Sequence, residues 1–286
     1  MKQLDANPRE LCPDISVRKP QDAGFTLVEL LVVIAVIVVM MVLAVPAFNA
    51  IRGSADFGTE VFDVAGTLDQ ARAYAMANNT YVLVGITEVT SSKSSSATPQ
   101  TSGTGRVAMA VIASKDGMRP YQDLLNTGTI SPQAWQTTYN NGSDFTAVTK
   151  LVSLQNLHLV DLQSGALPLP AAGNMLRPPV SAYYDVANIS QCVSLTPVAW
   201  PLGTSLSGAP VAQYQFNKVI EFNPQGAARI IVGGSSNNLD AIPYCIEIGL
   251  QPTNGAYTTT LASGSSGQIA AIQIDGMSGA TRIYQP

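Results

Sequence analysis

The chain begins with a polar segment, continues with an unbroken apolar run, and then changes to a mixed pattern that extends to its end. Residues 25–45 contain one charged side chain, Glu29, and the sixteen residues from Leu30 to Val45 are uncharged. As a helix, this segment would be about 31 Å long, which matches a hydrocarbon core of about 30 Å. The pattern therefore predicts a transmembrane helix over residues 25–45.

Beyond Val45 the pattern becomes amphipathic, because apolar and small side chains recur at spacings of three, four or seven residues, apart from one break. This period is typical of a helix with one buried face. We therefore expect a helical segment over residues 46–79 that ends at Asn78 and Asn79. Pro46 lies inside it, and an interior proline removes one hydrogen bond and bends the axis, so a kink is predicted there.

Residues 80–286 have the alternation and the β-branched composition of strands separated by polar loops. Strands are predicted at residues 81–89, 106–113, 151–162, 214–222, 228–232, 244–250 and 269–275. The Ser-, Thr- and Gly-rich stretch 90–105 is expected to be a flexible hairpin tip. Residues 115–210 are expected to form an irregular insertion, since seven of the eighteen prolines fall within 163–211. The predicted fold class is α+β, with a long helix packed on an antiparallel β-sheet domain.

Neither composition nor residue spacing points to an active site. Charged residues make up 12% of the chain and the net charge is −4, whereas a nucleic-acid-binding protein would be expected to have a basic face. The one histidine, His158, lies in an apolar strand pattern and is expected on the solvent-facing side of that strand. The sequence contains no cysteine–histidine spacing typical of a metal site and no nucleophile elbow. It therefore predicts no enzyme, no metal site and no cofactor.

The start of the apolar run has a more specific pattern. The leader, residues 1–24, carries four basic and four acidic side chains and ends in Gly24, after which the chain reads Phe-Thr-Leu-Val-Glu up to Glu29. This pattern resembles the prepilin signature of type IV pilins and of the pseudopilins of type II secretion. A secretory signal peptide would have a shorter apolar core, and Val45-Pro46-Ala47 is a poor cleavage site. A simple membrane anchor would explain neither Gly24 nor the carboxylate of Glu29, which is costly in a membrane.

The resemblance implies how the N-terminus is processed and used. A prepilin peptidase/N-methyltransferase would cut after Gly24 and methylate Phe25, so that Glu29 becomes the fifth residue of the mature chain and Pro46 the twenty-second. In the family, this glutamate is thought to pair with the N-terminal amine of a neighbouring subunit, and each charge would relieve the other's desolvation. The other implied partners are further pilin or pseudopilin subunits and the inner-membrane assembly platform. The implied location is the inner membrane, with a cytoplasmic N-terminus and a periplasmic C-terminal domain, and then a filament.

Three shorter stretches resemble a narrower group, the H-type minor pseudopilins and related minor pilins. Residues 68–75 carry the group's pattern of leucine, alanine–arginine and alanine before a first strand. Residues 222–226 resemble its phenylalanine-x-proline-x-glycine hairpin, and residues 272–283 resemble its closing strand pair. The resemblance implies a pilin-like fold and a structural, minor subunit. Residues 115–210 depart from it.

Cleavage would remove Cys12 and leave Cys192 and Cys245 in a domain outside the cytoplasm, where the two can form a disulfide. Two buried thiols are the alternative. The unmatched region 115–210 also leaves a second function open, a filament-borne or membrane-anchored binding module for a secreted substrate, a surface or DNA. The sequence does not distinguish a pilus from a secretion system.

Overall fold

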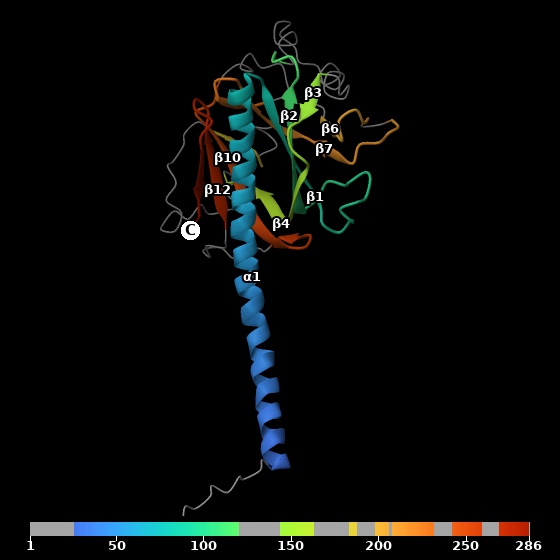
Figure 1. The fold of residues 1–286 in the computed structure, drawn as a ribbon, viewed down its shortest axis with the longest axis vertical. Coiled ribbons are helices and arrows are strands. Elements are labelled where there is room, and N and C mark those ends of the chain that lie inside the picture. Colours follow the sequence, from blue (N-terminus) through green and yellow to red (C-terminus); the bar gives the residue numbers. More distant parts are fainter. Residues whose placement is uncertain are drawn as a thin grey trace, which may run out of the picture. The chain divides into compact units, whose positions relative to one another are not determined.

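The computed structural model describes residues 26–119, 144–162, 183–187, 198–205, 208–231, 242–258 and 269–285, apart from the side chains of residues 42–55, 183, 184 and 258. One long helix, α1 (Leu27–Asn78), is followed by a β-rich region (Figure 1). Intrachain packing divides the chain after Ile51 into an N-terminal unit and a larger unit, Arg52–Pro286, which we call the globular unit. The strands are β1 (Val82–Thr90), β2 (Gly105–Ser114), β3 (Phe145–Ala147), β4 (Val152–Val160), β5 (Tyr183–Asp185), β6 (Val198–Trp200), β7 (Tyr214–Phe216), β8 (Lys218–Phe222), β9 (Ala228–Ile230), β10 (Cys245–Asn254), β11 (Tyr257–Thr258), β12 (Ala270–Asp275) and β13 (Thr281–Tyr284).

The C-terminus of α1 is closed by a defined hydrogen-bonded turn. Asn79 follows the last helical residue and adopts a positive φ of 49°, a conformation that asparagine tolerates better than most residues. The N–H of Thr80 then donates to the carbonyl of Ala75 at 3.1 Å, which is the long hydrogen bond of a Schellman motif. The predicted helix end at Asn78 and Asn79 is therefore confirmed, and β1 starts three residues later.

One mixed sheet dominates the globular unit. Its strand order is β13-β12-β10-β4-β2-β1-β8-β9; in addition, β3 pairs with β2, and β5 and β11 pair with β10. The described pairs are antiparallel except for β5, which runs parallel to β10 along the part of its edge that β4 leaves open. β6 and β7 form a separate two-stranded sheet. The structure thus agrees with the predicted α+β class and with a largely antiparallel sheet.

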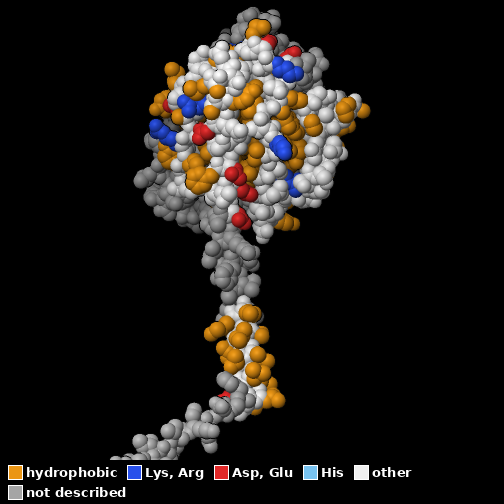
Figure 2. Space-filling view, in the orientation of Figure 1, with side chains coloured by type: hydrophobic (Ala, Val, Ile, Leu, Met, Phe, Trp, Pro, Cys, Tyr) orange, Lys and Arg blue, Asp and Glu red, His pale blue; other side chains and the backbone are white. Residues whose placement is uncertain are grey.

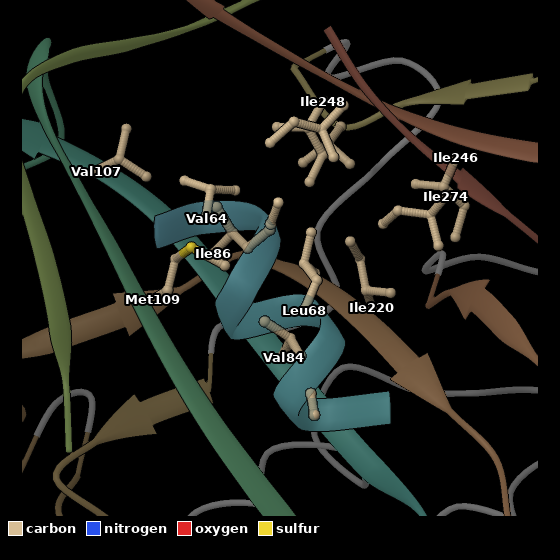
Figure 3. Close-up of a cluster of buried hydrophobic side chains, with 14 of the residues drawn as sticks. Val64, Leu68, Val84, Ile86, Val107, Met109, Ile220, Ile246, Ile248 and Ile274 are labelled. Carbon is tan, nitrogen blue, oxygen red and sulfur yellow. The ribbon is translucent and has the colours of Figure 1, made fainter. Parts of the chain in front are cut away.

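The part of α1 within the globular unit packs on one face of the sheet. Its apolar stripe, which includes Val64 and Leu68, contacts apolar side chains from the central strands (Figure 3). The helix contributes these buried residues: Phe57, Val61, Val64, Ala65, Leu68, Ala71 and Ala75. Ala71 and Ala75 are fully buried, and their small side chains allow the helix axis to lie close to the sheet. This layer is the main hydrophobic core.

The other face of the sheet is also buried. Leu83, Ala110 and Phe145 form a second apolar cluster there together with side chains from β6 and β7. Phe216 of β7 lies directly over Gly85 of β1, where an added Cβ would come within 2.7 Å of the ring carbon Cγ. Side chains of α1 thus cover one face of the sheet, and side chains of β6 and β7 pack on the other. The strand β2 is buried along its whole length.

Two hairpin turns converge beside the last turns of α1. Arg72 Nε donates to the carbonyl of Ser278 in the β12–β13 turn at 2.7 Å. Gly226 in the β8–β9 turn lies against Met76, and Gly279 packs so closely on Gly226 that a Cβ would collide with its carbonyl oxygen. The helix and both turns are thus joined at one place.

The predicted strands are all present, and most of their ends lie within a few residues of the expected positions. The predicted stretch 214–222 is divided into β7 and β8, which belong to different sheets. Three short strands in the expected irregular insertion, β3, β5 and β6, were not predicted. The hairpin tip 90–105 is held by hydrogen bonds that its composition did not indicate, including Arg106 Nη2 to the carbonyl of Lys93 at 3.0 Å. Within the insertion, residues 120–143, 163–182, 188–197 and 206–207 lie outside the described residues.

The junction of the two turns predicts unequal effects of two alanine substitutions. Gly203 and Gly279 both have positive φ values, 81° and 65°, but only at Gly279 would a Cβ meet other atoms. Gly203→Ala should lower the free energy of unfolding by about 1 kcal/mol through backbone strain alone. Gly279→Ala should lower it by about 3 kcal/mol or more, because backbone overlap is added. Urea denaturation of the full-length protein in detergent measures both, and equal losses would contradict this packing.

Candidate functional site

The beginning of α1 carries the polar group that the sequence singled out. The N–H of Thr26 donates to Glu29 Oε2 at 2.9 Å, and its hydroxyl donates to the same oxygen at 2.9 Å. In return, the N–H of Glu29 donates to the Thr26 hydroxyl at 3.2 Å. These reciprocal bonds are a capping box, which satisfies helix-terminal N–H groups and places a carboxylate at the positive end of the helix dipole. Thr26 was not predicted as a site residue, although threonine three residues before glutamate is the sequence signal of this motif.

The first turns of α1 are apolar around their whole circumference. Thirteen large hydrophobic side chains between Leu27 and Met41 are each 45–79% exposed. Figure 2 shows these side chains covering the described surface of this helical segment. A helix that is hydrophobic all round is normally buried in a membrane or in a bundle of helices. This surface therefore requires a partner or a lipid environment.

Among the described residues, no helix combines the length and hydropathy needed to cross a membrane.

Several predicted site residues fall outside the described residues. Gly24 and Phe25 precede Thr26, and Cys192 lies within the insertion. Cys245 is buried at the start of β10, and its disulfide with Cys192 stays a prediction. α1 continues through Pro46, whose side chain is not described, so the kink also stays a prediction.

The one histidine contacts a carboxylate. His158 Nδ1 lies 2.7 Å from Glu88 Oε1, and both side chains are largely buried. Glu88 lies on β1 and His158 on β4, and β2 runs between these two strands. The N–H of Gly105, the first residue of β2, also donates to Glu88 Oε1 at 3.4 Å. The His158 side chain is 23% exposed, and its carboxylate partner was not predicted from the sequence. In the part of the chain that the structure describes, no cluster of histidine, cysteine and acidic side chains is placed to hold a metal ion.

A buried charged cluster that the sequence did not reveal lies at β8 and β9. Glu221 is completely buried, and its Oε1 lies 3.0 Å from Arg229 Nε and 3.4 Å from Arg119 Nε. Two guanidinium groups therefore share one carboxylate away from water. Removing one member of such a group is strongly destabilising, because a charge is then left buried without compensation. The arrangement indicates a structural link between strands β8 and β9 and the segment that follows β2.

A second buried cluster contains two carboxyl groups in register. Asp185 of β5 lies opposite Glu247 of β10, and both are buried. The N–H groups of Leu162 and Ala187 donate to the two Asp185 oxygens at 2.8 Å each, while Gln273 Nε2 donates to Glu247 Oε1 at 3.0 Å. Asp185 thus joins the end of β4 to the inserted strand β5. Burial raises the pKa of Asp185 to about 7, and the charges of Asp161 and Glu247 add to this rise against the effect of the two N–H donors.

A third perturbed carboxyl group lies on α1 near the edge of the sheet. Partial burial raises the pKa of Glu60 to about 7, and the carboxylates of Asp56 and Asp63 contribute, although the N–H of Gln155 donates to it and opposes the rise. Gln155 stands beside a bulge in β4, where Asn156 has a positive φ of 55° and the register with β2 shifts. The bulge therefore brings a backbone donor of the sheet to a helix carboxylate.

A model of the prokaryotic N-terminal methylation motif matches residues 19–45 of the chain. No curated protein and no solved structure matches the chain. The matched segment includes Gly24, Phe25, Glu29 and the apolar turns of α1. The motif indicates a type IV pilin-like or pseudopilin-like protein, and it implies processing by a prepilin peptidase and assembly with other pilins.

The buried carboxyl pair predicts that the globular unit loses stability as the pH rises. The native pKa of Asp185, about 7, lies above the ordinary value of 3.8, so between these values the native state binds a proton that the unfolded state lacks. The free energy of unfolding should therefore fall across this range, by at most about 4 kcal/mol. Urea denaturation of the full-length protein in detergent at about pH 5, 6 and 7 measures the slope.

Asp185→Asn should flatten this slope. It should also lower stability near pH 5, because an amide offers one acceptor oxygen to the two N–H donors. Asp161→Asn is the matched control, since Asp161 contributes only a secondary effect and most of the slope should remain. A slope unchanged by Asp185→Asn would contradict the assignment.

Proposed function

We propose that this protein is a minor structural subunit of a type II secretion pseudopilus or a type IV pilus-like filament. Prepilin peptidase would cleave it after Gly24 and methylate Phe25. The inner-membrane assembly platform would then add it to the filament through the N-terminal part of α1. Before assembly, residues 25–45 would span the inner membrane, with the N-terminus in the cytoplasm and the globular unit in the periplasm.

The observation that carries this proposal is the methylation motif at residues 19–45. The apolar surface between Leu27 and Met41 supports it, since such a surface suits lipid first and the helices of other subunits afterwards. Both environments exclude water from these side chains. A structural role therefore accounts for the motif without an active site.

Glu29 has a specific part in this mechanism. Within the single chain, its carboxylate accepts two hydrogen bonds from Thr26 and so closes the first turn of α1. In the filament, the new amine of a neighbouring Phe25 would be a stronger partner, because opposite charges attract strongly in a low-dielectric environment. Since an unpaired carboxylate is costly there, the pair would favour assembly and would set the axial position of each subunit.

The convergence of two turns at the end of α1 supports a place in the H-type group. Arg72, from the alanine–arginine pattern, donates to the β12–β13 turn and lies against Gly226 of the β8–β9 turn. The three stretches that resemble this group are distant in sequence, yet they meet at this junction. A shared physical role, the attachment of two hairpins to the helix, gives a reason for their occurring together.

Substitutions at Gly24 and Glu29 should separate processing from assembly. Gly24→Leu should leave the precursor uncut, because the peptidase is expected to require glycine at the cleavage position. Glu29→Ala should give a chain that starts at methylated Phe25 in the membrane but is missing from the filament. Mass spectrometry of the N-terminus, on membranes and on sheared filaments, measures both steps.

Two further variants distinguish charge pairing from capping. Glu29→Gln keeps an acceptor for Thr26 but loses the charge, and it should fail to assemble as Glu29→Ala does. Thr26→Ala removes the hydroxyl but keeps the charge, and it should still enter filaments. Normal incorporation of Glu29→Ala would sink the pairing mechanism, and a native chain that retains Met1 would sink the proposed function.

A further inference from the structure

The sulfur of one methionine forms part of the junction between α1 and the two hairpin turns. Met76 lies near the C-terminus of α1 and is 47% exposed. A Cβ built on Gly226 would lie 2.8 Å from Met76 Sδ and 3.3 Å from its Cγ, so the thioether packs directly on the backbone of the β8–β9 turn. Since about half of the residue is exposed, a small reagent in solution can reach this side chain. Met76 thus combines a structural contact with chemical access.

The β8–β9 turn that faces this sulfur is held in one conformation. Asn223 Oδ1 accepts hydrogen bonds from the N–H groups of Gln225 and Ala227, at 3.0 and 2.8 Å. The N–H of Gly226 donates to the Asn223 carbonyl at 2.8 Å. The Gly226 carbonyl oxygen lies against Gly279 of the β12–β13 turn, so that a shift of one turn would also move the other. The turn therefore has little freedom to adapt to a larger group on the facing side chain.

Oxidation of a methionine sulfur requires only access and an oxidant. A lone pair of Sδ attacks one oxygen of hydrogen peroxide, so that a sulfur–oxygen bond forms and the oxygen–oxygen bond breaks. The sulfur loses two electrons, and the displaced hydroxide takes the proton of the transferred hydroxyl group and leaves as water. The product is a polar sulfoxide, whose oxygen requires hydrogen-bond donors. The N–H of Gly226 cannot serve as one, because it already donates to Asn223.

Contact with a glycine distinguishes Met76 from the other described methionines of the globular unit. Met277 in the β12–β13 turn is 73% exposed and Met118, which follows β2, is 67% exposed, so both are more accessible than Met76. Met109 is fully buried in the main core. Among the glycines that the structure describes, Gly226 is the one at which an added Cβ would have a methionine among its nearest neighbours. Oxidation of Met277 or Met118 should therefore disturb little packing, whereas oxidation of Met76 should disturb the junction.

We propose that Met76 is a reversible oxidation site, at which a peroxide converts the thioether to a sulfoxide and thereby detaches the β8–β9 turn from α1. The sulfoxide oxygen and its bound water do not fit between Sδ and Gly226, so the side chain turns to solvent and the contact is lost. A methionine sulfoxide reductase would return the side chain to the thioether and restore the contact. The site is independent of the proposed function, since it requires only the contacts of the globular unit.

Treatment of the full-length protein in detergent with hydrogen peroxide tests the site. Peptide mass spectrometry should show the gain of one oxygen at Met76, Met118 and Met277, and none at Met109. The Tm should fall by about 2–4 °C on oxidation. Hydrogen exchange of the amides in the β8–β9 turn should become about fivefold faster, because the turn has lost its contact with the helix. A Met76 that stays unmodified while Met277 is oxidised would overturn the proposal.

Two leucine variants assign the effect to one sulfur. Met76→Leu keeps a side chain of similar volume that peroxide does not oxidise, so its Tm should be the same before and after treatment. Met277→Leu is the matched control, because it also removes an exposed methionine but should lose as much Tm on oxidation as the wild type does. The comparison is made within each variant, so a change in the untreated stability of Met76→Leu does not affect it. An equal loss of Tm in wild type and Met76→Leu would contradict the assignment.

Enzymatic repair separates this oxidation from that of cysteine. Oxidised wild-type protein is incubated with methionine sulfoxide reductases A and B and a thiol reductant, and an unoxidised sample receives the same treatment. Both reductases are needed because each acts on one sulfoxide epimer. The Tm of the oxidised sample should return to that of the unoxidised sample as the extra oxygen at Met76 disappears. A Tm that stays low after Met76 has been reduced would rule out the sulfoxide as its cause.

Discussion

Burial of one face of α1 against the sheet is the interaction on which the globular unit depends. The helix supplies side chains such as Val64 and Leu68 that lie among isoleucines and valines of strands distant in the sequence. Burying each large aliphatic side chain contributes about 1.5–3 kcal/mol, so a few such residues exceed the net stability typical of a domain before the entropy cost is counted.

Both faces of this sheet are buried, whereas many antiparallel sheets have one face exposed to solvent. β2 is enclosed on both sides, and the short strands β3, β6 and β7 contribute to the second cover. Charged side chains that lie under this cover require partners, as the two arginines around Glu221 and the donors around Asp185 illustrate. The insertion is thus attached through polar groups as well as through apolar contacts, and the environment of Asp185 makes one of these attachments sensitive to pH.

The elements that could be predicted from the sequence are those with a recognisable hydrophobic period or a continuous β-branched run. α1 has a sustained apolar and then amphipathic pattern, and the long strands have continuous β-branched runs, so their positions could be predicted from the sequence. β3, β5 and β6 are three residues long and lie among prolines and polar residues, where no period can be recognised. The separation of β7 from β8 depends on Phe216 packing over Gly85, which is a tertiary contact without a local signal.

Some of the polar residues discussed above could likewise be recognised from the sequence, whereas others could be recognised only from the structure. Glu29 could be recognised because a charge in an apolar run is conspicuous, and Thr26 could have been found from its spacing to Glu29. Glu60 could not, since an acidic residue on an amphipathic helix is ordinary until the structure shows that it is half-buried and accepts a hydrogen bond from the Gln155 N–H. Glu221 and Asp185 resemble surface residues in the sequence, and only the insertion and the strand order show that they are buried.

The Schellman turn at Asn79 connects the helix register to the strand register. β1 begins at Val82, and Val82, Val84 and Ile86 face the helix whereas Leu83 faces the other side. Because strand side chains alternate with a period of two, one extra residue between Asn79 and Val82 would rotate every side chain of β1 to the opposite face. The number of residues in this connection is therefore constrained as strictly as the identity of a core residue. An insertion here would have to add two residues, or be compensated by a β-bulge, to keep the same side chains of β1 facing the helix.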